Sequence, residues 1–316
     1  MSILITGGAG FIGSHLVEAL VKLDSDIIVL DNFSTGRFNL HLLEKYPSVT
    51  VVKGDIADWD TVNRLTAKSS KIFHLAAMNR APRSIEDPLL SNEINITGTL
   101  YILEAARKHS VERIVFASSS SVYGRSEVFP RRENGETRPA HPYAVGKLAS
   151  EYYCDIYHFL YGLNITSLRY FAVYGPRQSP FITYAAVIPV FIRNLIEGNP
   201  ITIFGDGTQT RNFTFVEDTV RSTIMAMDSN KTSGKILNVA SQREVSLNEL
   251  LKIIEEISGQ SIKVRYEDWR QGDAKRAVPD LALAKRIIGF VPETSIKEGV
   301  KRTYEWFKAN PDYFLF

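Results

Sequence analysis

The chain has 316 residues, of which 44% are hydrophobic and 23% are charged. This length exceeds the size at which a single hydrophobic core stops growing, so we expect two unequal domains in close contact. The formal net charge is +2, and basic pairs such as Arg131 and Arg132 stand beside acids rather than in a stripe, which argues against a nucleic-acid partner.

Short apolar runs alternate with longer amphipathic stretches through the first half of the chain. This pattern is typical of parallel strands joined by crossover helices. The expected strands cover 3–5, 27–30, 50–52, 72–75, 114–117 and 165–170. The expected helices cover 14–23, 59–67, 92–108 and 144–161. The pattern predicts an α/β fold with a Rossmann-type doubly wound parallel sheet.

After Gly175 the regular alternation ends, because prolines interrupt the chain and helices such as 247–258 and 283–288 no longer alternate with strands. We expect a smaller C-terminal α/β domain that binds the substrate. Residues 211–227 resemble a strand followed by a helix, so we expect 210–241 to return to the first domain. The expected division is therefore 1–174 with 210–241 for the cofactor, and 175–209 with 242–316 for the substrate.

The beginning of the chain and its cysteine content both bear on the compartment. From Met1 the sequence runs directly into an apolar strand and a glycine turn, without a charged segment or a long apolar run. Cys154 is the single cysteine, which fits a reducing compartment. We expect a cytoplasmic protein without a membrane partner. The six histidines show no metal-ligand spacing backed by carboxylates, so we also expect no metal.

A glycine-rich turn, Gly7-Gly-Ala-Gly-Phe-Ile-Gly13, lies between the first expected strand and helix. Glycines at these positions allow a tight turn, a close approach of backbone to pyrophosphate, and close packing of helix on strand. The free N–H groups of the helix then face the phosphates. Asp31 ends the second strand, where a carboxylate accepts hydrogen bonds from a ribose diol and disfavours a 2′-phosphate. The sequence therefore predicts NAD as the cofactor. Asp55, after the third strand, is either an adenine contact or a turn residue.

Tyr143 and Lys147 lie four residues apart at the start of an expected helix, so their side chains share one face. A nearby ammonium favours the phenolate form of a tyrosine, which can then act as a base. Ser118 to Ser121 follow the fifth expected strand, at the sheet edge where doubly wound folds place their active sites. A serine hydroxyl there can hold a substrate oxygen against the tyrosine.

With these motifs together, the sequence resembles the extended short-chain dehydrogenase/reductases that act on nucleotide sugars, over nearly the whole chain. The match also includes His74-Leu-Ala-Ala77, Asn95 and Arg169-Tyr-Phe171. The resemblance implies that Ser119 is the active-site hydroxyl, that Tyr143 is the acid/base, and that Lys147 tunes Tyr143 and holds the nicotinamide ribose. The residues expected to bind the cofactor are Gly7, Gly10, Phe11, Ile12, Gly13, Asp31, Asn32, Asp55, Ile56, Leu75, Ala76, Ala77, Asn95, Tyr143 and Lys147.

Ser120 and Ser121 bear on the subfamily. Related 4,6-dehydratases carry an acidic pair in this segment, and decarboxylases keep a Glu where this chain has Ser121, so their absence favours 4-epimerases. Segments 81–88 and 184–189 look most like UDP-N-acetylglucosamine 4-epimerases, whereas 117–124 is also seen in UDP-glucuronate epimerases. We expect NAD-dependent 4-epimerisation of a UDP-hexose through a transient 4-keto sugar. The alternatives are a UDP-glucuronate 4-epimerase, a dehydratase or decarboxylase, and a non-catalytic NAD sensor.

The resemblance also implies a UDP-sugar site and a homodimer. The expected substrate contacts are Arg83, Ser119, Ser120, Arg211, Arg270, Asp273 and Ala277. Arg211 and Arg270 would face the diphosphate and Asp273 a ribose hydroxyl, while the small Ala277 leaves room for an N-acetyl group. Ala172 stands where the family has Asn, which removes an expected polar contact. The dimer would form through helices 92–108 and 144–161. Apolar contacts would come from Leu100, Leu103, Tyr153, Tyr157 and Leu160, although burial within one subunit explains these side chains almost as well.

Overall fold

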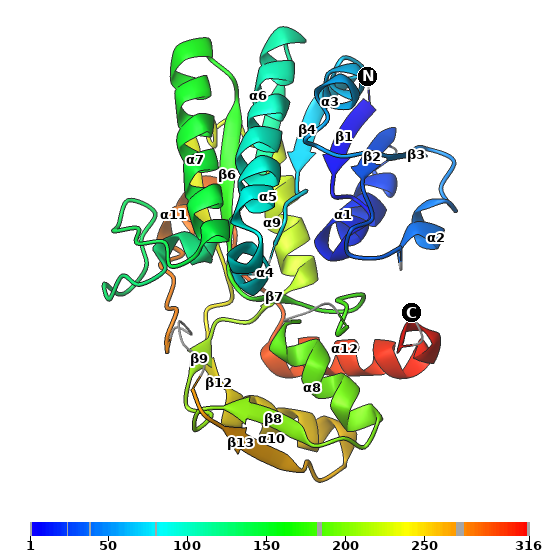
Figure 1. The fold of residues 1–316 in the computed structure, drawn as a ribbon, viewed down its shortest axis with the longest axis vertical. Coiled ribbons are helices and arrows are strands. Elements are labelled where there is room, and N and C mark those ends of the chain that lie inside the picture. Colours follow the sequence, from blue (N-terminus) through cyan, green and yellow to red (C-terminus); the bar gives the residue numbers. More distant parts are fainter. Residues whose placement is uncertain are drawn as a thin grey trace.

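A seven-stranded parallel sheet forms the centre of the larger part of the molecule (Figure 1). The computed structural model describes residues 2–23, 25–37, 39–79, 81–181, 185–269 and 275–314. The strands run in the order β3-β2-β1-β4-β5-β6-β11, and all neighbouring pairs are parallel. Their bounds are β1 Ser2–Thr6, β2 Ile27–Asp31, β3 Val49–Lys53, β4 Ser69–His74, β5 Arg113–Ser119, β6 Ile165–Tyr170 and β11 Lys235–Val239. The predicted doubly wound sheet is confirmed.

Helices cover both faces of this sheet, because successive side chains of each strand point to opposite faces and both sets are apolar. Ile5 and Val115 face a core that includes α1 Phe11–Val21 and α9 Val216–Asp228. Leu4 and Phe116 face a second core, which includes α3 Trp59–Thr66, α6 Gly98–Lys108 and α7 Pro142–Tyr161. The sheet is therefore buried on both sides.

The strand order reverses between β1 and β4, since β1 leads by α1 to β2 on one side and β4 lies on the other. Loops that leave the carboxyl ends of two such strands run in opposite directions and open a crevice. Three short elements lie between β4 and α6: α4 Ala81–Glu86, α5 Pro88–Asn92 and the π-helical turn η1 Glu93–Thr97. The expected helix 92–108 is thus interrupted by a π turn at its beginning.

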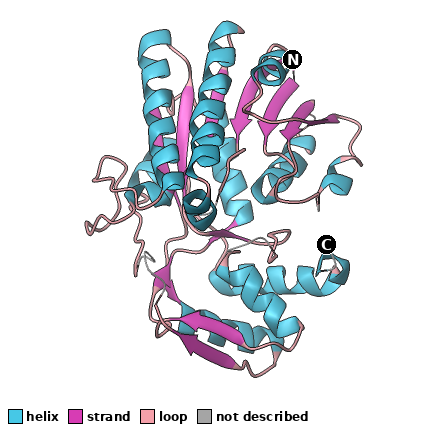
Figure 2. Ribbon diagram, viewed as in Figure 1, coloured by secondary structure: helices cyan, strands magenta, loops and turns pink. Residues whose placement is uncertain are grey.

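The smaller part of the molecule contains three helices and a parallel strand pair (Figure 2). It is built from α8 Val187–Ile196, β8 Ile201–Phe204, α10 Leu247–Ser258, β13 Val264–Glu267 and α12 Ile296–Ala309. The segment between β8 and α10 returns to the larger part, where α9 packs against α1 and β11 forms an edge of the sheet. On this arrangement we propose the division into two domains given above.

The remaining elements are short and connect these two parts. They are α2 Leu40–Leu43, the 3-10 turn η2 Ser120–Tyr123, β7 Val173–Tyr174, β9 Thr210–Arg211, β10 Thr214–Phe215, β12 Val245–Ser246, α11 Ala282–Ile288 and the 3-10 turn η3 Pro311–Phe314. In the part of the chain that the structure describes, no helix is both long enough and apolar enough to cross a lipid bilayer.

Candidate active site

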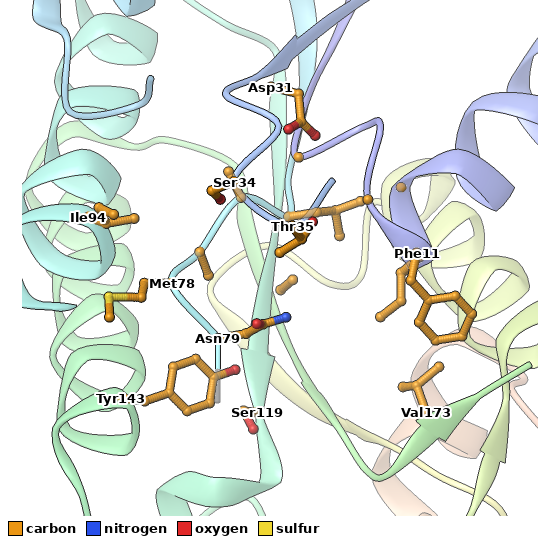
Figure 3. A pocket seen from close by; sticks show the side chains of 18 of the residues that line it. Phe11, Asp31, Ser34, Thr35, Met78, Asn79, Ile94, Ser119, Tyr143 and Val173 are labelled. Atoms are coloured by element: carbon orange, nitrogen blue, oxygen red, sulfur yellow. The ribbon is translucent and has the colours of Figure 1, made fainter. Parts of the chain in front are cut away.

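A cavity of about 740 Å³ lies at the carboxyl ends of the sheet strands, in the crevice where the strand order reverses. Its walls come from the β1–α1 turn, the ends of β2, β4 and β5, the start of α7, and the loop after β7. Figure 3 shows Asp31 at one end of this cavity and the Tyr143 and Ser119 side chains toward the other. The cavity therefore brings together the two groups of residues that the sequence motifs singled out.

The glycine turn forms one wall and is closely packed. Gly7 has a φ of +71°, and a Cβ added there would lie 2.7 Å from the backbone nitrogen of Ala76. Helix α1 begins directly after the turn, with Gly10 as its N-cap and no side chain accepting from its first amides. A helix start without a capping side chain leaves N–H groups and the positive end of the helix dipole available for an anion.

Asp31 is held rigidly beside the glycine turn, at the end of the cavity away from Tyr143. One carboxylate oxygen accepts a hydrogen bond from the amide of Ala9 at 3.0 Å, and the other accepts from the amide of Phe33 at 2.8 Å. Burial raises the pKa of Asp31, and these backbone donors act in the opposite direction. Next to it, Asn32 donates to Asp55 at 2.6 Å. These contacts fix the orientation of the carboxylate for hydrogen bonds with a ligand.

Three further side chains of the cavity wall were not predicted from the sequence. Asn39, Arg177 and Gln178 each line the cavity and are at least 94% buried. The Asn39 Oδ1, Arg177 Nη1 and Gln178 Oε1 atoms nevertheless have no hydrogen-bond partner among the described residues. Buried polar atoms without partners are costly, so their presence on a cavity wall indicates a polar ligand. No local sequence signal marks them, because tertiary folding brings them to the cavity.

Arg177 also ties the loop after β7 to α1. Its Nη2 donates to Glu18 and to the His15 Nδ1 at 2.7 Å, and its carbonyl accepts from the Tyr313 hydroxyl. Burial lowers the pKa of His15 to about 3, and the Arg177 charge adds to this effect. His15 is therefore neutral at ordinary pH and, together with Glu18, fastens the Arg177 loop to α1.

Tyr143 and Lys147 occupy the first turns of α7 and face the cavity. The Tyr143 amide donates to the Ser84 hydroxyl of α4 at 3.0 Å, which anchors the helix start. The Lys147 Nζ lies 6.0 Å from the centre of the Tyr143 ring and donates to the Ala117 carbonyl of β5 at 2.7 Å. At the end of β5, the Ser119 Oγ accepts from the Ser121 hydroxyl at 2.8 Å. Hydroxyl, phenol and ammonium groups thus meet in one place.

Lys147 is almost fully buried, at 3% exposure. Burial lowers its pKa to about 7, although the charge of Glu151 acts in the opposite direction. A lysine with such a pKa exchanges its proton readily near neutral pH. In its ammonium form, it places a positive charge beside the Tyr143 ring.

A buried ion pair supports this group from behind. Glu151 lies one helical turn after Lys147 and binds Arg169 of β6 through two hydrogen bonds of 2.9 and 2.7 Å. Glu151 also accepts from the Ser118 hydroxyl, next to Ser119 in β5. The Arg169 guanidinium lies 4.7 Å from the Tyr123 ring. In the sequence, Arg169 stands out only as part of a motif, and the structure places it beneath the site.

Most of the residues expected to bind the cofactor or the substrate line the cavity. They are Gly7, Gly10, Phe11, Ile12, Gly13, Asp31, Asn32, Asp55, Ile56, Leu75, Ala76, Ala77, Arg83, Ser119, Ser120, Tyr143 and Lys147. Ala172 lines it too, with a φ of +35°.

Asn95, Arg211 and Ala277 are not among the residues that line this cavity. Asn95 is buried and uses its amide to bind the backbone of Met78, so it fastens a loop of the cavity wall. The Arg211 Nη1 donates to the Thr210 carbonyl. Arg270 and Asp273 lie outside the described residues. Among the described residues, no three His, Cys, Asp or Glu side chains are grouped as metal ligands.

Comparison with known proteins bears directly on this site. The model of the NAD dependent epimerase/dehydratase family matches residues 3–240. The chain belongs to this family. A putative UDP-glucose 4-epimerase of Methanocaldococcus jannaschii is 39% identical over 98% of this chain and 99% of its own length.

Two solved structures of family members are closely similar. The UDP-N-acetylglucosamine 4-epimerase of Methanobrevibacter ruminantium has a TM-score of 0.93 and 34% identity, with 98% of each chain covered. The UDP-glucuronic acid 4-epimerase of Bacillus cereus, solved with UDP-glucuronic acid and NAD, has a TM-score of 0.91 and 33% identity. That alignment covers 98% of this chain and 99% of that one.

NAD is the cofactor of the family, and the cavity of this chain fits it. The start of α1 offers free amides to the pyrophosphate. The turn is so closely packed at Gly7 that a side chain would not fit there, and glycine lets the backbone approach the pyrophosphate closely. Asp31 offers its fixed carboxylate to a ribose diol, and the unpartnered Asn39, Arg177 and Gln178 atoms offer further polar contacts. The prediction of NAD from the sequence is confirmed.

Proposed function

We propose that this protein is an NAD-dependent 4-epimerase of a UDP-hexose. The observation that carries the proposal is the meeting of Ser119, Tyr143 and Lys147 at the end of the NAD cavity, with Ser120 and Ser121 lining the same wall. Dehydration and decarboxylation at this place call for carboxylates that these two serines replace. Oxidation and reduction at one carbon need only the tyrosine, the lysine and the hydroxyl.

The geometry supports the following roles for the side chains. Tyr143 removes the proton from the sugar 4-hydroxyl, Lys147 stabilises the phenolate by its charge, and Ser119 holds the sugar oxygen by a hydrogen bond. NAD, when bound, supplies the hydride acceptor and donor. Tyr143 returns its proton when the 4-keto sugar is reduced on its opposite face. The side chains thus end each turnover in their starting protonation state, and the substrate keeps its mass.

We propose UDP-glucose and UDP-galactose, together with UDP-N-acetylglucosamine and UDP-N-acetylgalactosamine, as the substrates. The epimerases of M. jannaschii and M. ruminantium support these two pairs. UDP-glucuronate is the second candidate, because the hydroxyl-rich wall from Ser119 to Ser121 could accommodate a carboxylate and the B. cereus enzyme is similar. Arg211, Arg270, Asp273 and Ala277 remain proposed substrate contacts.

The central test replaces the proposed acid/base. We expect Tyr143→Phe to lower turnover at least about 100-fold, the usual effect of losing a positioned acid/base. The assay incubates each UDP-hexose, with and without an N-acetyl or carboxylate group, and reads the C4 configuration by NMR. Tyr153→Phe, on the same helix but outside the cavity lining, is the matched control. Near-normal epimerisation by Tyr143→Phe would contradict the assignment.

Mass spectrometry of the product distinguishes the alternatives. An epimer keeps the mass of the substrate, whereas a dehydratase product lacks water and a decarboxylase product lacks CO₂. A purified protein that holds NAD but converts no nucleotide sugar would instead support a sensor.

We also propose a homodimer, with α7 in the interface. The structure changes the expected contacts, since Leu103 is buried within its own subunit and Tyr153 and Tyr157 are partly buried against the same core. Leu160 is 58% exposed and is joined on α7 by the exposed apolar side chains of Tyr152, Ile156 and Phe159. Light scattering of wild type and Phe159→Glu tests this: the wild type should be dimeric and the variant largely monomeric.

A further inference from the structure

One side chain beside the proposed acid/base has so far been given no role. His141 immediately precedes α7 and lines the cavity. Its ring is stacked on that of Tyr143, with the ring centres 6.0 Å apart and the planes inclined by 8°. Its Nδ1 accepts a hydrogen bond from the amide of Ala144 at 3.2 Å, so His141 is also the N-cap of the helix that carries Tyr143.

The backbone around His141 explains why an imidazole can serve both purposes. Pro142 occupies the first turn of α7 and disfavours a helical conformation for the residue before it. His141 is accordingly extended, with φ −157° and ψ 163°, which is the conformation that an N-cap needs. This backbone directs the ring back over the helix start, where Nδ1 meets the amide and the ring face meets Tyr143.

We propose that His141 positions Tyr143 for proton transfer, by capping the start of α7 with Nδ1 and by holding the phenol ring with its imidazole. The inference rests on the proposed function. Offset stacking of two rings restrains the inner one, and the cap keeps the first turn of the helix from fraying. The amide of Tyr143, which donates to the Ser84 hydroxyl, anchors its backbone at the same place.

The protonation state of His141 gives the proposal a specific readout. An Nδ1 that accepts from an amide must be unprotonated, so only the neutral imidazole caps the helix. Burial lowers the pKa of His141 below its usual 6.5. Between that lowered pKa and 6.5 the unfolded chain binds more protons than the folded one, so the contribution of His141 to stability is lost as the pH falls through this window.

The charged and titratable groups around this position are common to all variants of His141. On α4, η1, η2 and the first two turns of α7 they are Arg83, Glu86, Glu93, Tyr123, Tyr143 and Lys147, and Glu151 lies one turn farther along α7. Comparison of variants at a single position therefore removes their effects.

Two substitutions separate the cap from the stack. His141→Asn keeps a capping oxygen but has neither ring nor titration, and His141→Phe keeps a ring but has no acceptor. At pH 7.5, we expect His141→Asn to have the melting temperature of the wild type. We expect His141→Phe to melt about 2 °C lower. We expect kcat to fall roughly 2- to 10-fold in each variant with KM unchanged, because His141→Asn loses the aromatic pair and His141→Phe loses the helix cap.

The pH series gives the decisive result. As the pH falls from 7.5 to 5.5, the wild type should lose melting temperature relative to His141→Asn, because only the wild type loses its cap. The exposed His41 provides the control, and His41→Asn should follow the wild type at every pH. In the wild type at pH 7.5, ¹⁵N NMR of the His141 ring should show an unprotonated Nδ1.

Several outcomes would overturn the proposal. One is a difference in melting temperature between wild type and His141→Asn that stays constant across the pH series, and another is a protonated His141 Nδ1 in the wild type at pH 7.5. An unchanged kcat in both variants would also overturn it. So would a raised KM as the main effect, which would indicate contact with the substrate instead. If the wild type converts no UDP-hexose, the proposed function fails separately. The melting temperatures and the NMR then still decide whether His141 caps α7 beside Tyr143.

Discussion

The buried pair of Glu151 and Arg169 offers the most informative perturbation of this fold. Both side chains are at most 3% exposed, and two hydrogen bonds join them. Arg169 also donates to the Glu133 carbonyl at 3.1 Å and lies against the Tyr123 ring. Arg169→Met removes the cation and these hydrogen bonds and leaves a carboxylate inside the protein.

The expected magnitude follows from the burial of the charge that remains. Breaking a buried ion pair by removing one partner costs about 3–5 kcal/mol, mainly because the other charge stays buried without compensation. For a chain of this length, that cost corresponds to a fall in melting temperature of about 5–8 °C. The double variant Glu151→Gln with Arg169→Met has no such carboxylate, so it should be more stable than Arg169→Met alone.

Thermal unfolding of the four proteins of this cycle, at one saturating NAD concentration, measures the coupling. The matched control is Arg107→Met, which removes a pair with Glu104 on the exposed side of α6, where the side chains are 43% and 35% exposed. That variant should stay within about 1 °C of the wild type. The reasoning is refuted if Arg169→Met is as stable as the control, or if the double variant is no more stable than Arg169→Met.

Three other changes have defined outcomes. Gly7→Ala should abolish NAD retention after gel filtration, because its Cβ would lie 2.7 Å from the Ala76 nitrogen in a left-handed backbone; retention of equimolar NAD would disprove this. Lys147→Met should raise the melting temperature at pH 7, because burial opposes the charge of Lys147, and a less stable variant would contradict this. The same variant should lower turnover at least about 100-fold. Acid should destabilise the protein progressively between pH 6.5 and about 3, because burial lowers the pKa of His15 and His74 to about 3 and unfolding lets both take up protons; a flat stability profile would argue against it.

Much of this structure follows from local patterns. Short continuous apolar runs predict the strands, and helical spacing predicts α1, α3, α7 and α10 to within a few residues. The glycine turn and Asp31 predict the NAD site for a similar reason, since strand, turn, helix and strand are contiguous in the chain. Tyr143 and Lys147 lie one turn apart on a single helix, so their proximity is also a local property.

Contacts between distant segments could not be derived in this way. Asn39, Arg177 and Gln178 reach the cavity from two loops far apart in sequence, and nothing in either loop marks them as cavity residues. Periodicity likewise gives the apolar face of a helix but not what covers it, and the structure buries Leu103 within its own subunit, which was one of the two explanations left open by the sequence.

The sequence by itself determined the order of the elements, the cofactor turn and the Tyr143–Lys147 pair, because each depends on residues only a few positions apart. The tertiary structure alone decided what surrounds that pair. It placed Arg169 of β6 on Glu151, and it brought the Ser84 hydroxyl of α4 to the amide of Tyr143. Such arrangements depend on side-chain packing between elements, which the sequence pattern of one element does not specify.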